Sequence, residues 1–489
     1  MASTELARKV IREFIEHGII DFVLSPGSRN APLSIALHEA SKRGLVNLHI
    51  RIDERTAAFF ALGIIKATRR PAALVCTSGT AVANYYPAFL EAFHSNLPLY
   101  VLSADRPARL RQTGANQTTN QVHLFNCGRY FDGSNYEFHA NGPTHINLEF
   151  DEPLLSDDKR NWLEDLASDE LLTERLVQEE LLIPSGKGIV IAGHDSVDVS
   201  ELVAQLKVPL IAENPLSYSN ALAHASLFSG QIEIDWAIVA GRTTLSRSTN
   251  SLIAKAKEVF VIDSKAARID PKRSATKIFS KVPKLIGQAE PWTINSEFIS
   301  INEWSEPAAA QCIAEQLPNG STLYVSSSRP IRDLEAFAKP RSGVEVFANR
   351  GLAGIDGNLS TAIGIASKRD CTYAVVGDLA FLHDLTALVN QEPVKLKLLV
   401  INNNGGGIFS TLPQAGVAGF EQIFGTPHNR DLFEIAKVFG VPTTEIENLK
   451  ALKSFMSPPT KFEIGILQMP DRESNAALIK ELAKRVNYR

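Results

Sequence analysis

The chain has 489 residues, with 50 Lys and Arg against 54 Asp and Glu, which gives a formal net charge of −4. At about 150 residues per domain, this length predicts about three domains. The near-neutral charge, with no long block of one sign, argues against a dedicated nucleic-acid or membrane-surface binder. Hydrophobic residues make up 44% of the chain, enough for large cores and too many for extensive disorder. The sequence predicts a globular protein.

The N-terminus and the cysteines predict a cytoplasmic protein without a membrane span. Residues 1–18 mix charged and apolar side chains at helical spacing, which favours a folded helix over a secretion signal. No apolar run approaches the roughly 20 residues that cross a bilayer. The four cysteines lack the spacing of a zinc site, and we expect them to be small buried residues in a reducing compartment. They are Cys76, Cys127, Cys312 and Cys371.

Strand-like and helix-like segments alternate along nearly the whole chain. This pattern is typical of βαβ units, so the predicted fold class is α/β with mainly parallel sheets. The first predicted domain covers residues 1–155. Its expected strands lie at 21–27, 45–51, 71–79 and 97–105, and its expected helices include 54–69 and 80–95.

Two further domains are expected after a polar, acidic stretch that we interpret as a helical connector. The region 156–300 contains this connector and a central α/β domain, with predicted strands at 186–193, 208–213, 235–241 and 258–264. The region 301–489 has predicted strands at 321–328, 343–349, 371–378, 395–404 and 461–468. Three consecutive α/β domains are therefore the predicted architecture.

Two strand ends in the third domain carry polar residues. One strand ends at Asp378, and the next is followed by Asn403 and Gly405. The spacing suits a single crossover through a helix at 381–390, which would place both ends on one edge of a parallel sheet, where ligands bind. A carboxylate, an amide oxygen and a backbone carbonyl near Gly405 would suit a hard cation such as Mg²⁺. Taken alone, the pattern is equally compatible with a helix cap and a turn.

Two other phosphate-binding motifs do not fit the sequence. A P-loop needs GxxxxGK[ST], and Lys187 is followed by another glycine without the upstream spacing. A dinucleotide fold could use Gly405 and Gly407, but Ser410 stands where the third glycine belongs.

The Gly377-Asp378 pair followed by Asn403 resembles the diphosphate and metal motif of thiamine-diphosphate enzymes. Six segments extend this resemblance: SPGSRNAPL (25–33), IDERTAAFFALG (52–63), TSGTAVANYYPA (77–88), ADRPARLRQTGANQ (104–117), NRGLAGIDG (349–357) and NNNGGGIF (402–409). In this order they are similar to the 2-succinyl-5-enolpyruvyl-6-hydroxy-3-cyclohexene-1-carboxylate synthase family of menaquinone biosynthesis. The similar segments are dense in the first and third domains and sparse in the middle one.

The resemblance implies thiamine diphosphate with Mg²⁺ or Mn²⁺ as cofactors. The cofactor would lie between the N-terminal pyrimidine-binding domain of one subunit and the C-terminal diphosphate- and metal-binding domain of another, which implies a homodimer or tetramer. Glu54 would hydrogen-bond the aminopyrimidine, and Ile355 would support the folded cofactor. The other matching cofactor positions are Gly377, Asp378, Asn403 and Gly405, the last three as metal ligands. Alone, Glu54 would be interpreted as an acidic residue at a helix N-terminus.

The implied reaction decarboxylates 2-oxoglutarate and adds the resulting succinyl carbanion to isochorismate. Both substrates are dicarboxylates, and arginine forks suit their recognition. The matching catalytic and substrate positions are Ser28, Arg29, Arg106, Gln117, Ser328, Arg332 and Arg350, with Ile408, Phe409 and Leu412 as an apolar wall. Gln117 is expected to orient the second substrate or a water. The middle domain departs from the family's Lys-Arg pair, because Arg247 replaces the lysine and Ser248 follows it.

Two other functions stay open at this point. Another thiamine-diphosphate carboligase or decarboxylase with a different acceptor would not depend on Arg29 and Arg106. A catalytically silent cofactor-binding homologue is the second alternative. The joint presence of Glu54, Asp378 and Asn403 argues against it.

Overall fold

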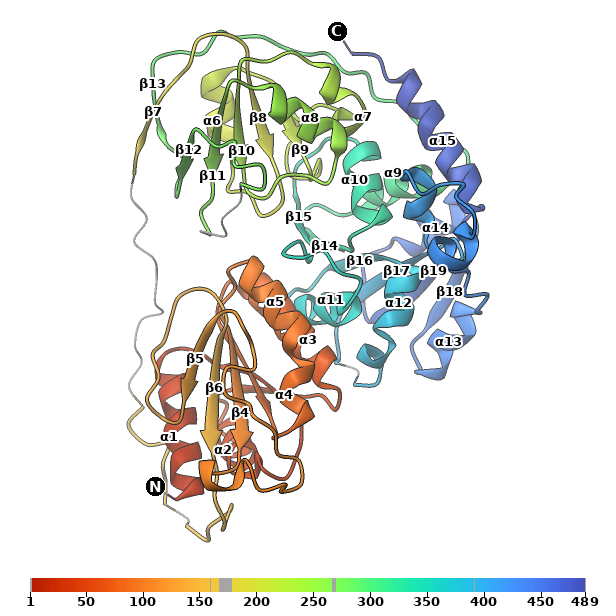
Figure 1. Ribbon diagram of the computed structural model, residues 1–489. Helices are drawn as coiled ribbons and strands as arrows, with labels where there is room; N and C mark the ends of the chain where they lie inside the picture. Colours follow the sequence, from red (N-terminus) through yellow and green to blue (C-terminus); the bar gives the residue numbers. More distant parts are fainter. Residues whose placement is uncertain (1, 159, 167–177, 266–269, 391, 489) are drawn as a thin grey trace. The chain divides into compact units, whose positions relative to one another are not determined.

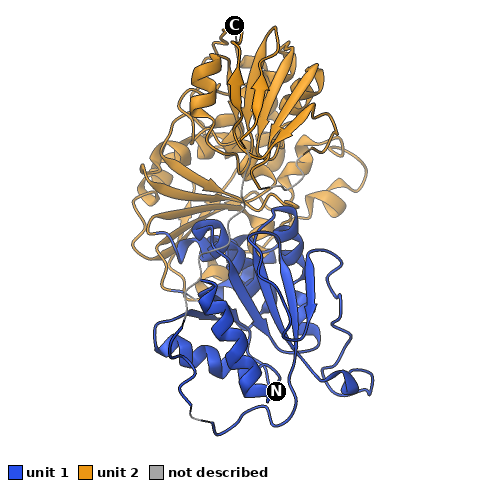
Figure 2. Ribbon diagram, turned by 90° about the vertical axis from the view of Figure 1, so that its left-hand side faces the viewer, with its two compact units in different colours: residues 1–175, 356–369, 383–392 blue, residues 176–355, 370–382, 393–489 orange. Residues whose placement is uncertain are grey.

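The computed structural model describes residues 2–158, 160–166, 178–265, 270–390 and 392–488. The chain divides into two compact units, one made of residues 1–175, 356–369 and 383–392 and the other of residues 176–355, 370–382 and 393–489 (Figure 2). Strands within each described sheet pair in parallel and are linked largely by helices (Figure 1), so the predicted α/β class is confirmed. None of the described helices combines the length and the hydrophobicity needed to cross a membrane.

The first unit is built on a six-stranded sheet in the order β2-β1-β3-β4-β6-β5. Its strands are β1 (Asp21–Leu24), β2 (Asn47–Ile50), β3 (Ala72–Cys76), β4 (Leu99–Asp105), β5 (Arg129–Asp132) and β6 (Thr144–Glu149). Its helices are α1 (Ser3–Glu16), α2 (Ala31–Lys42), α3 (Glu54–Thr68), α4 (Thr80–Asn84), α5 (Tyr86–His94), the short η1 (Ala108–Leu110) and, from late in the chain, α11 (Asn358–Ala366) and η3 (Leu385–Leu388). The expected strands are present. β5 and β6 were not predicted, and β6 buries polar residues that break the apolar pattern of a strand.

The second unit contains a five-stranded and a six-stranded sheet. The five-stranded sheet has the order β12-β11-β10-β8-β9. Its strands are β8 (Gly188–Ala192), β9 (Leu210–Ala212), β10 (Trp236–Ala240), β11 (Glu258–Ile262) and β12 (Lys277–Phe279), with helices α6 (Ser200–Leu206), α7 (Ala225–Phe228), η2 (Ser229–Gln231) and α8 (Arg247–Lys255). A separate pair joins β13 (Lys284–Ile286) to β7 (Glu180–Leu182).

The six-stranded sheet of the second unit has the order β15-β14-β16-β17-β19-β18. Its strands are β14 (Ser321–Val325), β15 (Val344–Phe347), β16 (Thr372–Gly377), β17 (Leu396–Asn402), β18 (Thr443–Ile446) and β19 (Phe462–Gln468). The helices of this region are α9 (Glu306–Gln316), α10 (Arg329–Phe337), α12 (Asp378–His383), η4 (Gly407–Thr411), η5 (Glu421–Gly425), α13 (Leu432–Val438), α14 (Leu449–Phe455) and α15 (Arg472–Arg485). Each of the three predicted domain ranges contains one large sheet, and the ranges themselves stay a prediction.

The connector predicted as helical is not helical where the structure describes it. Residues 156–158 and 160–166 have irregular backbone, and residues 167–177 lie outside the described part. The guanidinium of Arg12 in α1 donates hydrogen bonds to the carbonyls of Trp162 (3.1 Å), Glu164 (2.7 Å) and Asp165 (2.6 Å). These arginine contacts use carbonyl groups that a helix would have paired internally.

The helix predicted at 381–390 is broken after His383, where α12 ends. Asp384 follows, and its carboxylate accepts hydrogen bonds from the backbone N–H of Ser360 (2.7 Å) and from its hydroxyl (3.0 Å). Burial raises the pKa of Asp384 to about 7. A short helical turn, η3, then replaces the continuous helix that the apolar pattern indicated.

Helices α3 and α11 of the first unit approach each other at their backbones. A Cβ atom added to Gly63 would lie 2.2 Å from the carbonyl oxygen of Thr361, and one added to Gly364 would lie 2.1 Å from that of Phe60. Backbone atoms cannot rotate aside as side chains can. Only glycine therefore permits this close approach.

We expect Gly63→Ala to lower the free energy of unfolding by about 2 kcal/mol or more, because overpacking against backbone exceeds the gain in helix propensity. Chemical denaturation followed by circular dichroism measures the change. Gly377→Ala is the matched control, since a Cβ there meets no atom within 4 Å. Equal stability of the two variants would contradict the backbone contact.

His145 in β6 is a buried imidazole that the fold keeps neutral. Its Nε2 atom lies 2.7 Å from the hydroxyl of Ser103, which also donates to the side chain of Asn147 (2.9 Å). Burial lowers the pKa of His145 from 6.5 to about 3. Between these two values the unfolded chain binds a proton that the folded chain does not, so folding loses free energy as the pH falls.

The His145→Gln variant should lose less stability on acidification than the unchanged protein. Each pH unit below about 6.5 lowers the free energy of unfolding of the unchanged protein by up to about 1.4 kcal/mol through His145. Between pH 7.5 and pH 5, the unchanged protein should therefore lose about 2 kcal/mol more than the variant. Urea unfolding at both pH values measures this difference. Parallel losses would show that His145 is not the group that titrates.

Candidate functional site

The carboxyl edge of the six-stranded sheet in the second unit brings Asp378 next to the loop after β17. β16 and β17 are neighbours, with Gly377 opposite Ile401, so the expected adjacency is confirmed. The buried carboxylate of Asp378 accepts a hydrogen bond from the backbone N–H of Gly405 (2.8 Å) through Oδ2. The ring of His428 lies 3.3 Å from the same oxygen.

These residues fit a diphosphate held by a divalent cation. Asn403 Oδ1 is buried and has no hydrogen-bond partner among the described residues, so this oxygen can serve as a ligand to a cation. A Cβ at Gly377 would meet no atom within 4 Å, which leaves room beside the strand end. Gly405 adopts a φ of +132°, a conformation reserved largely for glycine. Carboxylate, amide and carbonyl oxygens form the donor set that Mg²⁺ and Mn²⁺ prefer.

The loops after β1, β3 and β4 converge at the carboxyl edge of the first unit's sheet. The backbone N–H of Arg29 donates to the hydroxyl of Thr77 (3.3 Å). A Cβ at Gly27 would lie 2.3 Å from the Cβ of Thr77, so this approach requires glycine. Arg106 Nη1 donates to the hydroxyl of Ser78 (3.0 Å) and to the carbonyl of Gln117 (2.8 Å).

Two guanidinium groups lie at this edge, and acidic residues lie near both of them. Arg29 Nη1 donates to the carbonyl of Phe150 (3.1 Å) and forms an ion pair with Glu152 (3.3 Å). The pKa of Arg106 is lowered by burial and by the positive charge of Arg29. Guanidinium groups are the side chains best suited to bind a ligand through its carboxylate groups.

Three other predicted residues of the first unit lie at exposed or half-buried positions. Ser28 and Gln117 are exposed, and Gln117 adopts a left-handed φ of +51°. Glu54 is the half-buried first residue of α3, next to the helix cap formed by Asp53, whose carboxylate accepts from the N–H of Arg55 (3.0 Å).

The second unit holds the remaining predicted residues. Ser328 precedes α10 with a φ of +75°, and its carbonyl accepts from Arg332 Nη1 (2.7 Å). Burial lowers the pKa of Arg332. Arg247 is exposed in the first turn of α8, and Ile355 is 46% exposed. The three apolar wall residues, Ile408, Phe409 and Leu412, are half-buried around η4.

Arg350 is already engaged by another charged residue. Its guanidinium donates to both carboxylate oxygens of Glu213, from Nε (3.0 Å) and from Nη2 (3.2 Å), and Nη2 also donates to the carbonyl of Thr243 (3.1 Å). Both side chains are buried. Burial raises the pKa of Glu213, while Arg350 opposes that rise. A direct role of Arg350 toward substrate stays a prediction, and the structure adds a role in holding the end of β9.

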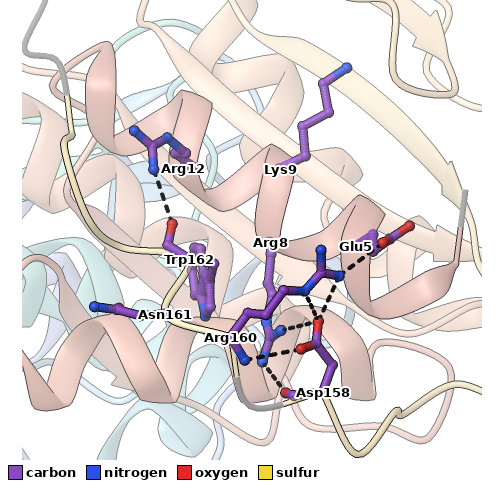
Figure 3. Close-up of a pocket in the computed structure, with 8 residues that line it drawn as sticks. All are labelled: Glu5, Arg8, Lys9, Arg12, Asp158, Arg160, Asn161 and Trp162. Carbon is purple, nitrogen blue, oxygen red and sulfur yellow. Dashed lines mark hydrogen bonds and ion pairs between the residues drawn. The ribbon is translucent and has the colours of Figure 1, made fainter.

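A cavity of about 440 Å³ lies beside α1, and its lining includes none of the predicted site residues (Figure 3). Arg8 pairs with Asp158 (3.1 Å), and Arg160 pairs with Asp158 (2.8 Å) and with Glu5 (3.0 Å). Since these charges are matched, we assign the cluster to fastening the irregular segment onto α1.

Comparison with known proteins gives full-length relatives. Residues 4–124 match the family model of the thiamine pyrophosphate enzyme N-terminal TPP binding domain. A protein of Nocardioides sp. is 38% identical, over 94% of this chain and 93% of its own. Relatives in Thermobifida fusca (35% identical, 91% and 92% covered) and Lysinibacillus sphaericus (31%, 99% and 98%) are also similar. All three are named 2-succinyl-5-enolpyruvyl-6-hydroxy-3-cyclohexene-1-carboxylate synthase. The chain belongs to this synthase family.

Solved structures support the fold of this synthase family member. Benzoylformate decarboxylase from Polynucleobacter necessarius matches with a TM-score of 0.65 at 14% identity, covering 97% of this chain and 99% of its own. An enzyme from Mycobacterium smegmatis, described by its name as thiamin diphosphate-dependent, matches with a TM-score of 0.67 at 13% identity, covering 96% and 100%. At these identities the likeness is evidence of the fold alone.

Several residues that organise these sites were not predicted from the sequence. Thr77 and Ser78 lie within the segment 77–88, but only the contacts to Arg29 and Arg106 show the roles of their hydroxyl groups. Glu306 accepts a hydrogen bond from Asn403 Nδ2 (2.7 Å), although the two residues are 97 positions apart. No local pattern marks Glu306 as a partner of Asn403.

Arg106→Ala should loosen the loop that carries Gln117, because it removes the hydrogen bonds from Nη1 to Ser78 and to the carbonyl of Gln117. We expect at least tenfold faster amide hydrogen exchange in residues 113–121, measured by mass spectrometry. Arg109→Ala is the control, since Arg109 is an exposed neighbour that pairs with Asp151. If both variants exchange alike, Arg106 does not hold the loop.

Proposed function

We propose that the chain catalyses the thiamine-diphosphate-dependent decarboxylation of 2-oxoglutarate and the addition of the succinyl group to isochorismate. The products are 2-succinyl-5-enolpyruvyl-6-hydroxy-3-cyclohexene-1-carboxylate and CO₂, in menaquinone biosynthesis. The observation that carries the proposal is similarity over 91% to 99% of the chain to synthases of this name. The oxygen donors around Asp378 and the arginines around Ser78 are consistent with it.

The proposed cofactor contacts rest on the family resemblance, and the chemistry of these residues fits them. Asp378, Asn403 Oδ1 and the carbonyl of Gly405 would hold Mg²⁺ or Mn²⁺, and Gly377 leaves space for the diphosphate. Glu54 would accept a hydrogen bond from the aminopyrimidine, and Ile355 would support the cofactor with apolar surface. When bound, thiamine diphosphate supplies the electron sink for breaking and making bonds at a carbonyl carbon.

Substrate recognition rests on the arginines. Arg29 and Arg106 would bind carboxylates while Thr77 and Ser78 hold their loops in place. Ser28 and Gln117 would orient the reacting groups. In the second unit, Ser328, Arg332, Arg350 and Arg247 would add polar contacts, and Ile408, Phe409 and Leu412 would exclude water.

The proposed assembly is a homodimer or tetramer with the cofactor at the interface of two subunits, in the cytoplasm. This part rests on the family resemblance. Light scattering of the purified protein with and without thiamine diphosphate and Mg²⁺ measures the mass of the assembly. A monomer that turns over substrates would contradict it.

The test of the function is reconstitution with isochorismate, 2-oxoglutarate, thiamine diphosphate and Mg²⁺, with each component omitted in turn. Consumption of isochorismate that requires all four supports the proposal. If 2-oxoglutarate is decarboxylated while isochorismate persists, the acceptor is wrong and the cofactor chemistry remains. If folded protein consumes neither substrate, the protein is a silent homologue.

In the same assay, Glu54→Gln should lower kcat by at least about 100-fold, because a neutral amide cannot replace the proton-accepting carboxylate. The Kd for thiamine diphosphate, measured by calorimetry, should change by less than about tenfold. Glu201→Gln is the control, since Glu201 also lies in the first turn of a helix but is exposed. Unchanged kcat in Glu54→Gln would remove Glu54 from catalysis.

A further inference from the structure

A buried charged cluster lies next to Asn403 in the second unit. Glu306 is at the start of α9, and Arg329 and Asp333 are on α10. Their exposed fractions are 4%, 8% and 4%. Arg329 Nε lies 3.6 Å from Glu306 Oε2, and Arg329 Nη2 donates to the carboxylate of Asp333. Two carboxylates thus share one guanidinium away from water.

The cavity beside this cluster is too small to hold a substrate. The cavity lined by Glu306, Arg329 and Asp333 offers about 20 Å³ to water, room for about one molecule. The remaining lining is mainly apolar and includes Leu323, Val325 and Val375 from the centre of the sheet. The charges therefore act on neighbouring protein groups.

Glu306 has one neighbour whose orientation it can dictate. Asn403 Nδ2 donates a 2.7 Å hydrogen bond to Glu306 Oε1. An ionised carboxylate has acceptors only, so the amide must turn its NH₂ group toward Glu306 and its oxygen away. That oxygen, Oδ1, is buried and has no partner among the described residues.

The backbone around Glu306 holds its carboxylate in place. Its N–H donates to Asn475 Oδ1 (2.8 Å), and the hydroxyl of the preceding Ser305 accepts from the N–H of Ala308 (3.3 Å) to cap α9. An acidic residue in the first turn of a helix is favoured by the helix dipole. The guanidinium of Arg329 lies 3.6 Å from the other carboxylate oxygen, Oε2.

We propose that Glu306 is a positioning residue that fixes the side-chain amide of Asn403, so that Oδ1 is presented to the divalent cation. The inference rests on the proposed metal site and adds a residue outside its ligands. Groups that orient metal ligands through a second hydrogen bond typically change metal affinity 10- to 100-fold when they are replaced. Arg329, which is itself held by Asp333, completes the support from 3.6 Å away from Glu306 Oε2.

The first experiment measures Mn²⁺ binding by electron paramagnetic resonance, with thiamine diphosphate present and no substrate. Glu306→Gln should weaken Mn²⁺ binding 10- to 100-fold, because a glutamine amide can donate as well as accept and no longer selects one orientation of Asn403. Glu335→Gln is the matched control, since Glu335 is also a buried carboxyl group, on α10, and no contact joins it to Asn403 in the described structure. It should bind Mn²⁺ within threefold of the unchanged protein.

Exchanging the charged and the amide group between Glu306 and Asn403 tests whether Glu306 orients Asn403 or only packs against it. Asn403→Asp puts a second carboxylate against Glu306 and should weaken Mn²⁺ binding at least tenfold through repulsion. The double variant Asn403→Asp with Glu306→Gln should recover to within about threefold of the unchanged protein, because the glutamine NH₂ can donate to the new aspartate. A purely structural role for Glu306 predicts that the two losses add. Additive losses overturn the proposal.

Asp378→Asn distinguishes failure of this inference from failure of the metal site. If Asp378→Asn weakens Mn²⁺ binding while Glu306→Gln binds within threefold of the unchanged protein, the positioning role is wrong and the metal site stands. If Asp378→Asn has no effect, the proposed site and this inference are both wrong. Circular dichroism shows whether Glu306→Gln folds. If it does not, the double variant decides: tighter Mn²⁺ binding than in Asn403→Asp supports the proposal, and equal or weaker Mn²⁺ binding overturns it.

Discussion

Parallel pairing of β16 with β17 is the constraint on which the candidate metal site depends. Because both strands run in the same direction, their carboxyl ends meet at one edge, and a carboxylate after one strand reaches the backbone after the other. The first unit repeats this geometry with different chemistry. There the loops after β1, β3 and β4 bring hydroxyl groups and arginines together at one edge.

The parts of the fold that sequence predicts well are those with a strong local signal. β16 and β17 are continuous apolar runs that end in polar residues, so both the strands and their adjacency could be inferred from spacing. β6 was missed because Thr144, His145 and Asn147 are buried polar residues, and the side-chain partners of His145 and Asn147 lie on another strand and a loop. The predicted helix at 381–390 failed for a related reason, since the carboxylate of Asp384 is bound by α11.

The candidate sites show the same division between local and distant information. Motif spacing pointed to Asp378, Asn403 and Gly405 before any contact was known. It gave no indication that Arg350 is bound by Glu213, a residue 137 positions away, or that Asn403 is bound by Glu306. A buried charge is paired with a residue that the fold brings near, and this residue can lie far away in the sequence. No local spacing pattern indicates such a partner. Sequence therefore indicates the residue types of a site better than their supports.

The contact between α3 and α11 has a consequence for synthesis of the chain. α3 ends at Thr68 and α11 begins at Asn358, about 290 residues later. At about 5 to 20 residues per second, a ribosome needs roughly 15 to 60 s to cover that distance. During this interval the surface of α3 around Gly63 lacks the helix that covers it, although the last strand of the same sheet in the chain, β6, is complete by Glu149. A fragment that stops before residue 358 keeps that backbone surface exposed permanently.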